Sequence, residues 1–387
     1  SGFGQTFFIS LFAPEIKQTF DLTNGGWGWV YMVATLGSAA TLIYLGPVVD
    51  KFGIAAVAVA VALCLAAASV GMAFIGGSIV FLIAVVFALR LFGQGMMTHV
   101  SMTAMGRWFV GNRGRAVSIA TLGHQGSELL FPLAFLALAA SLGWRNAWLA
   151  AAILLVAFAP FLLWLLKKER DPATAEPEQQ STSYRRQWTR KEMLRDPLFH
   201  LLMAGVLAPP FIGTSIFFHQ AHLMEIKGLA RGVFAGGLGV MAVVTIVFAL
   251  VAGSMVDRFS AVRVARYFLL PLGSGCVVLA SFDTQMAVFG YLSLMGVTYG
   301  FASTLGGALL PEIYGTAHLG SIRAVLVAAM VFLTAAGPGL TGTLIDVGIG
   351  FETQIMVMAI YCLFATFLLV FVSRLLVLRL ASEEATG

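Results

Sequence analysis

The sequence predicts an all-α integral membrane protein in which twelve transmembrane helices form two pseudo-symmetric six-helix bundles. Three observations support this: the composition, the spacing of the apolar runs and an internal repeat. Of the 387 residues, 59% are hydrophobic and 11% are charged, and the mean hydropathy is +0.92. A soluble domain is nearer half apolar and a quarter charged. So few charges cannot cover a soluble surface, and the apolar runs must therefore face lipid.

Twelve apolar runs are long enough to span a bilayer. A spanning helix needs ~20 mostly apolar residues, because every backbone amide must be satisfied inside the segment. The first six runs cover 2–19, 25–45, 54–75, 79–105, 115–140 and 146–166. The second six cover 198–223, 232–256, 264–282, 285–309, 322–346 and 353–377. The three cysteines lie inside these runs and are expected to be small core residues: Cys64, Cys276 and Cys362.

The basic residues predict which ends of the spans are cytoplasmic. With the first span running outward, 18 of the 23 Lys and Arg residues lie in inner loops, the inner termini or the central linker. Four lie outside, namely Lys17, Arg145, Lys227 and Arg231, and Arg90 lies within a span. Cytoplasmic loops of membrane proteins carry an excess of Lys and Arg. We therefore expect an inner-membrane (plasma-membrane) protein with both termini cytoplasmic, whose formal net charge of +5 requires no nucleic acid partner.

One long polar stretch divides the chain. Residues 167–196 include "ERDPATAEPEQQSTSYRRQ", which is rich in Pro, Glu, Gln, Ser and Arg. This composition is typical of a solvated linker. The predicted domains are an N-terminal bundle over 1–166, a cytoplasmic linker over 167–196 and a C-terminal bundle over 197–387.

The two halves repeat each other in parallel. "GPVVDKFG" begins at Gly46 and "GSMVDRFS" at Gly253, 207 residues later, each at the predicted inner end of a span. When the two octapeptides are aligned, Asp50 corresponds to Asp257 and Lys51 to Arg258. Two further pairs recur 206 residues apart: Gly114 with Gly320, and Pro132 with Pro338. Landmarks in one order at one spacing indicate parallel six-span repeats, which are a mark of secondary transporters.

These motifs resemble those of the major facilitator superfamily. G-x-x-x-D-[KR]-x-G after span 2, echoed after span 8, is similar to its signature, and "RLFGQG" in span 4 resembles a second one. "RWFVGNRGRA" before span 5 and "LGWRNAW" before span 6 resemble the oxalate/formate and monocarboxylate branch. "NGGWGW" also resembles a monocarboxylate-porter motif, but that motif opens span 1, whereas here it opens span 2. The resemblance implies the major facilitator fold and transport by alternating access.

The repeated octapeptides are predicted to gate the inner side. The resemblance places the start of span 11, near Ser321, beside Asp50, and the start of span 5, near Arg115, beside Asp257. A carboxylate is favoured at a helix N-terminus by ~1 kcal/mol, which is enough to bias an equilibrium and weak enough to break in each cycle. The alternative is a topogenic charge pair without a gating role. The predicted gating residues are Gly46, Asp50, Lys51, Gly53, Gly253, Asp257, Arg258, Arg115 and Ser321.

Ionisable residues at membrane depth are costly and are functional candidates by default. Arg90 in span 4 and Glu128 in span 5 fall near mid-membrane and could pair. His124 and Glu128 are four residues apart and share a helix face, so Glu128 is expected to titrate near neutral pH and carry a proton. The alternative is a static structural ion pair. His219 lies near the outer end of span 7, where it could also face water.

The resemblance also implies which residues line a central cavity. Spans 1, 4, 7 and 10 line it in the superfamily, which adds the following candidates: Gln5, Gln94, Gln220, Tyr299 and Ser303. Oxalate/formate-type relatives are expected to carry cationic side chains in spans 8 and 11, yet no Lys or Arg occurs at membrane depth there. The sequence therefore favours a monovalent anion held by Arg90, or a neutral or zwitterionic solute, over a dicarboxylate.

The predicted function is a secondary transporter for a small organic solute, driven by proton symport. A proton-coupled exporter of drugs or metabolites is the alternative, and an intramembrane enzyme is a distant one, because paired Asp, Ser–His and H-E-x-x-H patterns are missing. A channel is disfavoured by the gated repeat. The expected partners are the substrate, protons and the lipid bilayer; we expect a monomer without cofactor or metal.

Overall fold

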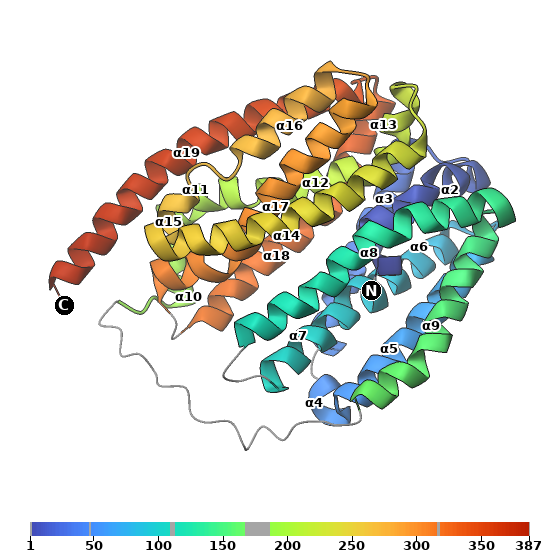
Figure 1. Ribbon diagram of the computed structural model, residues 1–387, viewed down its shortest axis with the longest axis horizontal. Helices are drawn as coiled ribbons and strands as arrows, with labels where there is room; N and C mark the ends of the chain where they lie inside the picture. Colours follow the sequence, from blue (N-terminus) through green and yellow to red (C-terminus); the bar gives the residue numbers. More distant parts are fainter. Residues whose placement is uncertain (1, 46–47, 109–112, 167–185, 316–317, 387) are drawn as a thin grey trace. The chain divides into compact units, whose positions relative to one another are not determined.

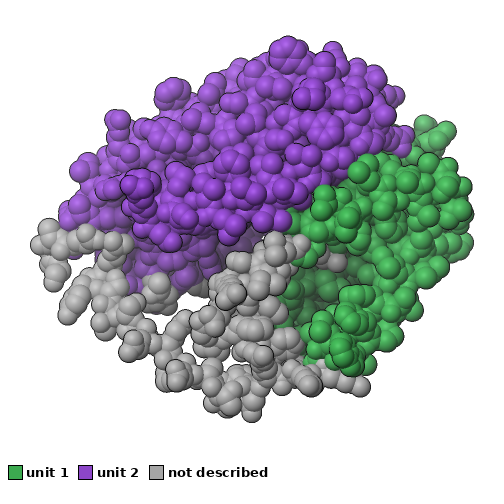
Figure 2. All heavy atoms as spheres, in the orientation of Figure 1, with its two compact units in different colours: residues 1–180, 217–222, 338–347 green, residues 181–216, 223–337, 348–387 purple. Residues whose placement is uncertain are grey.

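The computed structural model describes residues 2–45, 48–108, 113–166, 186–315 and 318–386. Within these ranges the side chains of residues 50, 51, 105–108, 113–122, 320, 321 and 384–386 are not described. The chain groups by contacts into two compact units (Figure 2). Unit 1 comprises Ser1–Gln180, Phe217–His222 and Pro338–Val347, and unit 2 comprises Ser181–Ile216, Leu223–Gly337 and Gly348–Gly387. The predicted division at residues 167–196 stays a prediction.

The regular elements described in the first half of the chain are all helices, joined by short turns (Figure 1). Its elements are η1 (Gly2–Gly4), α1 (Thr6–Ile9), η2 (Ser10–Phe12), α2 (Ala13–Phe20), α3 (Asn24–Leu45), α4 (Val48–Phe52), α5 (Ile54–Ala73), α6 (Ile79–Ala88), η3 (Leu89–Met96), α7 (Met97–Trp108), α8 (Arg113–Leu142) and α9 (Trp144–Leu166). The elements α6, η3 and α7 form one continuous span whose middle, η3, is a π-helix. Helix α5 packs along α9, and buried aliphatic side chains of α5, η3 and α7 form a core beside them.

The second half follows the same pattern. Its helices are α10 (Arg190–Arg195), α11 (Pro197–Val206), α12 (Ala208–Phe218), α13 (Gln220–Ile226), α14 (Arg231–Phe259), α15 (Ala261–Val264), α16 (Leu270–Ser281), α17 (Gln285–Tyr314), α18 (Leu319–Asp346) and α19 (Phe351–Thr386). Helix α14 packs along α17, and α16 packs against both α17 and α19. Span 7 is interrupted at Leu207, two residues before Pro209, because prolines lack the amide donors that a continuing helix needs. By contrast, α18 continues through Pro338.

Ten helices of the described residues are long and apolar enough to cross a membrane. The two predicted spans missing from that set are interrupted. The first is divided into η1, α1, η2 and α2, and the ninth contains only the twelve-residue apolar helix α16. Cys276 and Cys362 are buried as expected, but Cys64 is exposed on α5, so the expectation of a core position was wrong there. Because α5 is apolar along nearly its whole length, apolar residue type alone does not show which of its side chains are buried and which, like Cys64, are exposed.

The repeated octapeptides end in the same backbone turn. Gly53, the last residue of the first, has φ 76° and ψ 156°, and Ser260, the last of the second, has φ 80° and ψ 150°. Each immediately precedes a helix, α5 and α15. The repeat is therefore present in backbone geometry as well as in sequence, although the second copy places a serine where glycine is favoured.

Candidate functional site

The first span is broken where it meets the π-helix of span 4. Gln5 caps α1 with extended backbone angles, and it separates η1 from α1. The neighbouring Gly4 has no room for a side chain, because a Cβ there would clash with the carbonyl oxygen of Leu89 and lie 2.6 Å from the Cα of Gly93. Glycines thus let the two backbones touch, and the break leaves the carbonyl oxygen of Gly4 beside η3, where it accepts from Arg90.

The π-helix η3 carries the "RLFGQG" motif, with Arg90 and Gln94 in it. Single π-turns inside α-helices occur frequently at functional sites. The Arg90 side chain is 3% exposed and donates through Nη1 to the carbonyl oxygen of Gly4 at 3.1 Å and to Oγ1 of Thr6 at 3.4 Å. Its guanidinium carbon lies 5.0 Å from the ring centroid of Tyr31, whose hydroxyl hydrogen-bonds to Thr6.

The guanidinium of Arg90 has no carboxylate partner in the described part of the chain. Its Nε is also buried without a hydrogen-bond acceptor. The suggested pairing of Arg90 with Glu128 is not found there, because the guanidinium turns toward the broken first span instead. A buried charge that lacks an ionic partner is costly, and its neutral contacts with Gly4, Thr6 and Tyr31 offset only part of that cost. An anion beside the guanidinium would offset the rest of that cost.

Glu128 and His124 lie side by side on one face of α8, as their i, i+4 spacing predicted. The distance from Nε2 of His124 to Oε1 of Glu128 is 3.4 Å, and Glu128 is 6% exposed. The His124 ring also contacts the ring of Phe7, with 6.5 Å between centroids. One helix turn further along α8, Phe131 stacks on Phe3. Through His124 and Phe131, helix α8 therefore contacts the same first span that Arg90 contacts.

Residues 217–222 complete the polar surroundings of the first span. Gln220 donates through Nε2 to the carbonyl oxygen of Phe7 at 2.9 Å and to Oγ of Ser10 at 2.6 Å. Ser10, fully buried, donates in turn to the carbonyl oxygen of Phe217. His219 is also buried, with Nε2 3.2 Å from the carbonyl oxygen of Pro338, so it does not face water at an outer mouth.

The predicted lining residues thus divide between the two units. Unit 1 contains Arg90, His124, His219 and Gln220, each in contact with the first span or α18, together with Glu128 beside His124 and with Gln5 and Gln94. Tyr299 and Ser303 belong to unit 2, on α17. Ser303 bonds to the carbonyl oxygen of Gly300, and the Tyr299 hydroxyl occupies the space beside Gly213.

Most of the predicted inner gate lies outside the described part of the chain. Gly46 is not described, and neither are the side chains of Asp50, Lys51, Arg115 and Ser321. Of the second copy, Asp257 is exposed and Arg258 lies over the ring of Phe259, at 5.2 Å. A Cβ on Gly253 would meet no atom within 4 Å, so close backbone approach is not what this glycine provides in the structure.

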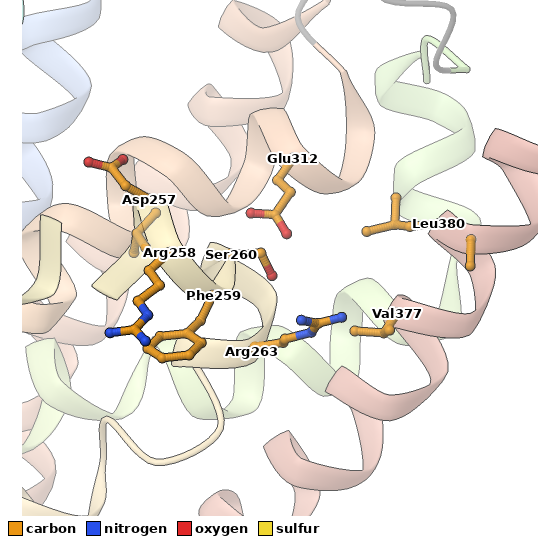
Figure 3. A pocket seen from close by; sticks show the side chains of 10 residues that line it. Asp257, Arg258, Phe259, Ser260, Arg263, Glu312, Val377 and Leu380 are labelled. Carbon is orange, nitrogen blue, oxygen red and sulfur yellow. The ribbon is translucent and has the colours of Figure 1, made fainter. Parts of the chain in front are cut away.

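Asp257 and Arg258 line a pocket of about 540 Å³ in unit 2 (Figure 3). On another side of this pocket Glu312 accepts a hydrogen bond from the amide of Ala261 at 2.7 Å. The carboxylate that accepts a hydrogen bond from the start of α15, just before span 9, is therefore Glu312, which the sequence analysis did not single out. Its position on α17, 51 residues away, explains why no local pattern indicated it.

Comparison with known proteins agrees with this architecture. Residues 1–330 match the family model of the Major Facilitator Superfamily. The chain belongs to the major facilitator superfamily. It is 24% identical over 306 residues to an uncharacterized MFS-type transporter, YcxA, of Bacillus subtilis (strain 168), covering 76% of this chain and 72% of that protein.

Solved structures of the superfamily share the fold. Two are of a bacterial homolog to the human lysosomal transporter Spinster, in inward-facing unoccupied and inward-facing occupied conformations. The TM-scores are 0.72 and 0.71 at 14% and 16% identity, and each match covers 96% of this chain and 94% of the other. Membership identifies the protein as a secondary transporter that is integral to the membrane, and not as an enzyme.

The site contains residues that the sequence analysis missed. Thr6, Tyr31 and Ser10 are polar residues inside apolar runs, and each was indistinguishable from an ordinary helix residue that bonds to its own backbone. The density of glycine at Gly2, Gly4 and Gly93 is the signal that could have indicated a close approach of spans 1 and 4, because glycine marks tight helix contacts in membranes.

Proposed function

We propose that this superfamily member takes up a small monovalent organic anion or zwitterion by proton symport, alternating access to a site around the first span. The observation that supports it is the buried guanidinium of Arg90, which has no carboxylate partner in the described residues. A carboxylate of the solute would supply the missing counter-charge. The motifs similar to the oxalate/formate and monocarboxylate branch, "RWFVGNRGRA" and "LGWRNAW", favour the same class.

The proton site in this proposal is the pair of Glu128 and His124. His124 contacts Phe7 of the first span, a span that Arg90 also contacts, and Glu128 lies beside His124, so a solute bound there can sense their protonation through residues 2–7. A buried carboxylate beside an imidazole can exchange a proton without either group leaving the site. Arg90 binds the anion, and Gln5, Gln94 and Gln220 of the same unit supply polar contacts around it. The termini are cytoplasmic and the protein acts as a monomer.

The experiment is uptake into liposomes containing the purified protein, with and without an imposed pH gradient. The probes are radiolabelled lactate and glycine betaine, with succinate as the dicarboxylate that should not be carried, and passive entry is subtracted with protein-free liposomes. We expect Glu128→Gln to abolish the response to the pH gradient while exchange of the solute across the membrane continues. Glu225→Gln, which removes an exposed carboxylate that the site does not use, is the matched control.

Arg90→Gln tests the anion site separately. Removing one partner of a desolvated charge pair costs ~2–5 kcal/mol, so the affinity for lactate should fall at least ~30-fold. Arg195→Gln, at an exposed position, should leave it unchanged. The proton assignment fails if Glu128→Gln still concentrates the solute as the parent does, and the anion assignment fails if Arg90→Gln binds lactate normally.

A further inference from the structure

The first turn of α3 and the last turns of α18 are joined within unit 1 by a carboxylate. Asp346, the last residue of α18, accepts hydrogen bonds from the backbone amides of Gly25 at 2.8 Å and Asn24 at 3.2 Å. These are the first two residues of α3. The first amides of a helix have no partners inside it, and they carry partial positive charge, so a carboxylate there is doubly favoured.

The same two helix ends also meet backbone to backbone. A Cβ on Gly28 would lie 2.9 Å from Cα of Gly339, and one on Gly342 would lie 2.5 Å from the carbonyl oxygen of Asn24. These glycines come from the "NGGWGW" and "GPGLTG" segments, for which the transport site provides no use. Side chains could not be added at these positions without separating the two helices. The segments are therefore built to close tightly.

Further polar contacts surround this crossing. Nε1 of Trp29 donates to Oγ1 of Thr343 at 3.1 Å, and Nζ of Lys17 donates to Oδ1 of Asn24 at 2.8 Å. Asp346 and Trp29 are exposed, so water can replace their hydrogen bonds when the contact opens. Hydrogen bonds that water can replace are suitable for a contact that has to open and close in every transport cycle.

We propose that Asp346 and the first turn of α3 form an outer latch that holds the predicted extracellular side shut. The inference rests on the proposed alternating access. The sequence predicts a second carboxylate contact at the other end of the same two spans, with the roles exchanged. There Asp50, after span 2, would face the start of α18. Spans 2 and 11 would then carry one carboxylate latch at each end, and engaging one latch would accompany release of the other.

The test measures opening by the labelling rate of a buried cysteine. Ser10→Cys is introduced into the full chain carrying Cys64→Ser, Cys276→Ala and Cys362→Ala, and the purified protein is reacted with N-ethylmaleimide. Ser10 is fully buried against Phe217 and Gln220, so its labelling reports separation of the outer ends. Adding Asp346→Asn should speed labelling about five- to thirty-fold, since charged hydrogen bonds are lost from the closed state only.

Asp21→Asn is the matched control. Asp21 is exposed three residues before Asn24, in a left-handed conformation that asparagine tolerates, and its removal subtracts the same charge from the same end of the unit. It should label at the parent rate. The latch is refuted if Asp346→Asn labels within twofold of the parent, or if Asp21→Asn accelerates labelling equally.

A second variant opens the contact without changing charge. Gly342→Ala should also accelerate labelling, because the added methyl group collides with the carbonyl of Asn24, whereas Gly232→Ala, where a Cβ meets nothing within 4 Å, should not. Parent-like labelling of Gly342→Ala would contradict the tight closure. Failure of the latch remains distinguishable from failure of the proposed function, because Asp346→Asn tests the latch by labelling of the purified protein, whereas Glu128→Gln tests proton coupling by uptake into liposomes.

Discussion

Lys227 shows how one buried cation can hold three segments of unit 2 together. Its side chain is fully buried, and Nζ donates to Oδ1 of Asp283 at 2.6 Å, to Oε1 of Glu352 at 2.5 Å and to the carbonyl oxygen of Phe282 at 3.2 Å. The three partners lie after α16 and at the start of α19, whereas Lys227 follows α13. The sequence analysis counted this residue only as an outside charge. Its three partners explain why a Lys is tolerated where solvent cannot reach it.

Lys227→Met should destabilise unit 2 by about 1–3 kcal/mol, because the substitution keeps the volume of the side chain but removes its charged hydrogen bonds. Lys227 also holds the pKa of the Asp283 carboxyl below its ordinary value. A lowered folded-state pKa contributes stability above the unfolded value of ~3.9, and this contribution is lost as the pH falls through the folded value. The measurement is thermal unfolding in detergent at pH 7 and pH 3.5. An equal deficit at both pH values would contradict the assigned role of Asp283.

At the scale of elements, interruptions of helices decide where chemistry can occur. The broken first span and the π-helix η3 bring Arg90 to the carbonyl oxygen of Gly4 and the hydroxyl of Thr6. "LGWRNAW" also has an observed local role, because Arg145 donates to the carbonyl oxygens of Ala73 and Ile75 at the end of α5. This motif therefore stabilises a helix end in the structure, whatever branch of the superfamily it resembles.

The turn shared by the two octapeptides leads to a prediction about Ser260. A residue with φ 80° and ψ 150° occupies a region that is essentially restricted to glycine and costs ~1–3 kcal/mol for other residues. Ser260→Gly should therefore raise the free energy of unfolding by about 1 kcal/mol, and Gly53→Ser, at the first copy, should lower it. Chemical denaturation of the purified variants measures both.

Ser254→Gly provides the control for that prediction. It makes the same substitution in the interior of α14, where glycine weakens a helix by ~1 kcal/mol, so its effect should have the opposite sign. If Ser260→Gly destabilised the protein as much as Ser254→Gly does, the strained turn at Ser260 would be refuted.

For the whole molecule, the charge distribution predicts its orientation in the membrane. In a variant without the native cysteines, Gln18→Cys should react with a membrane-impermeant maleimide on intact cells, because the end of α2 is predicted to be outside. Ala381→Cys, near the end of α19, should react only after the membrane is permeabilised. Both positions are exposed, so access from one side of the membrane alone distinguishes them. The reverse pattern would invert the predicted topology and make the latch at Asp346 cytoplasmic.

Much of the fold could be predicted because its signals are local or periodic along the chain. Apolar runs, the 206- to 207-residue repeat and the i, i+4 spacing of His124 and Glu128 are all visible in the sequence. The partners of Arg90 were not, because Gly4 and Thr6 lie 86 and 84 residues away and nothing in their neighbourhood marks them as acceptors. Membrane helices of similar hydropathy can also pack in many registers, and hydropathy does not choose between them.

The sequence by itself determined that this is a membrane protein with two similar helical halves and few internal charges, because insertion into lipid depends on local hydrophobicity. Only the tertiary structure decided which polar groups meet. It turned Arg90 toward the broken first span, and it brought Asp346 to the amide of Gly25, 321 residues away. Such pairs depend on how closely backbones approach, and here glycines without side chains allow that approach.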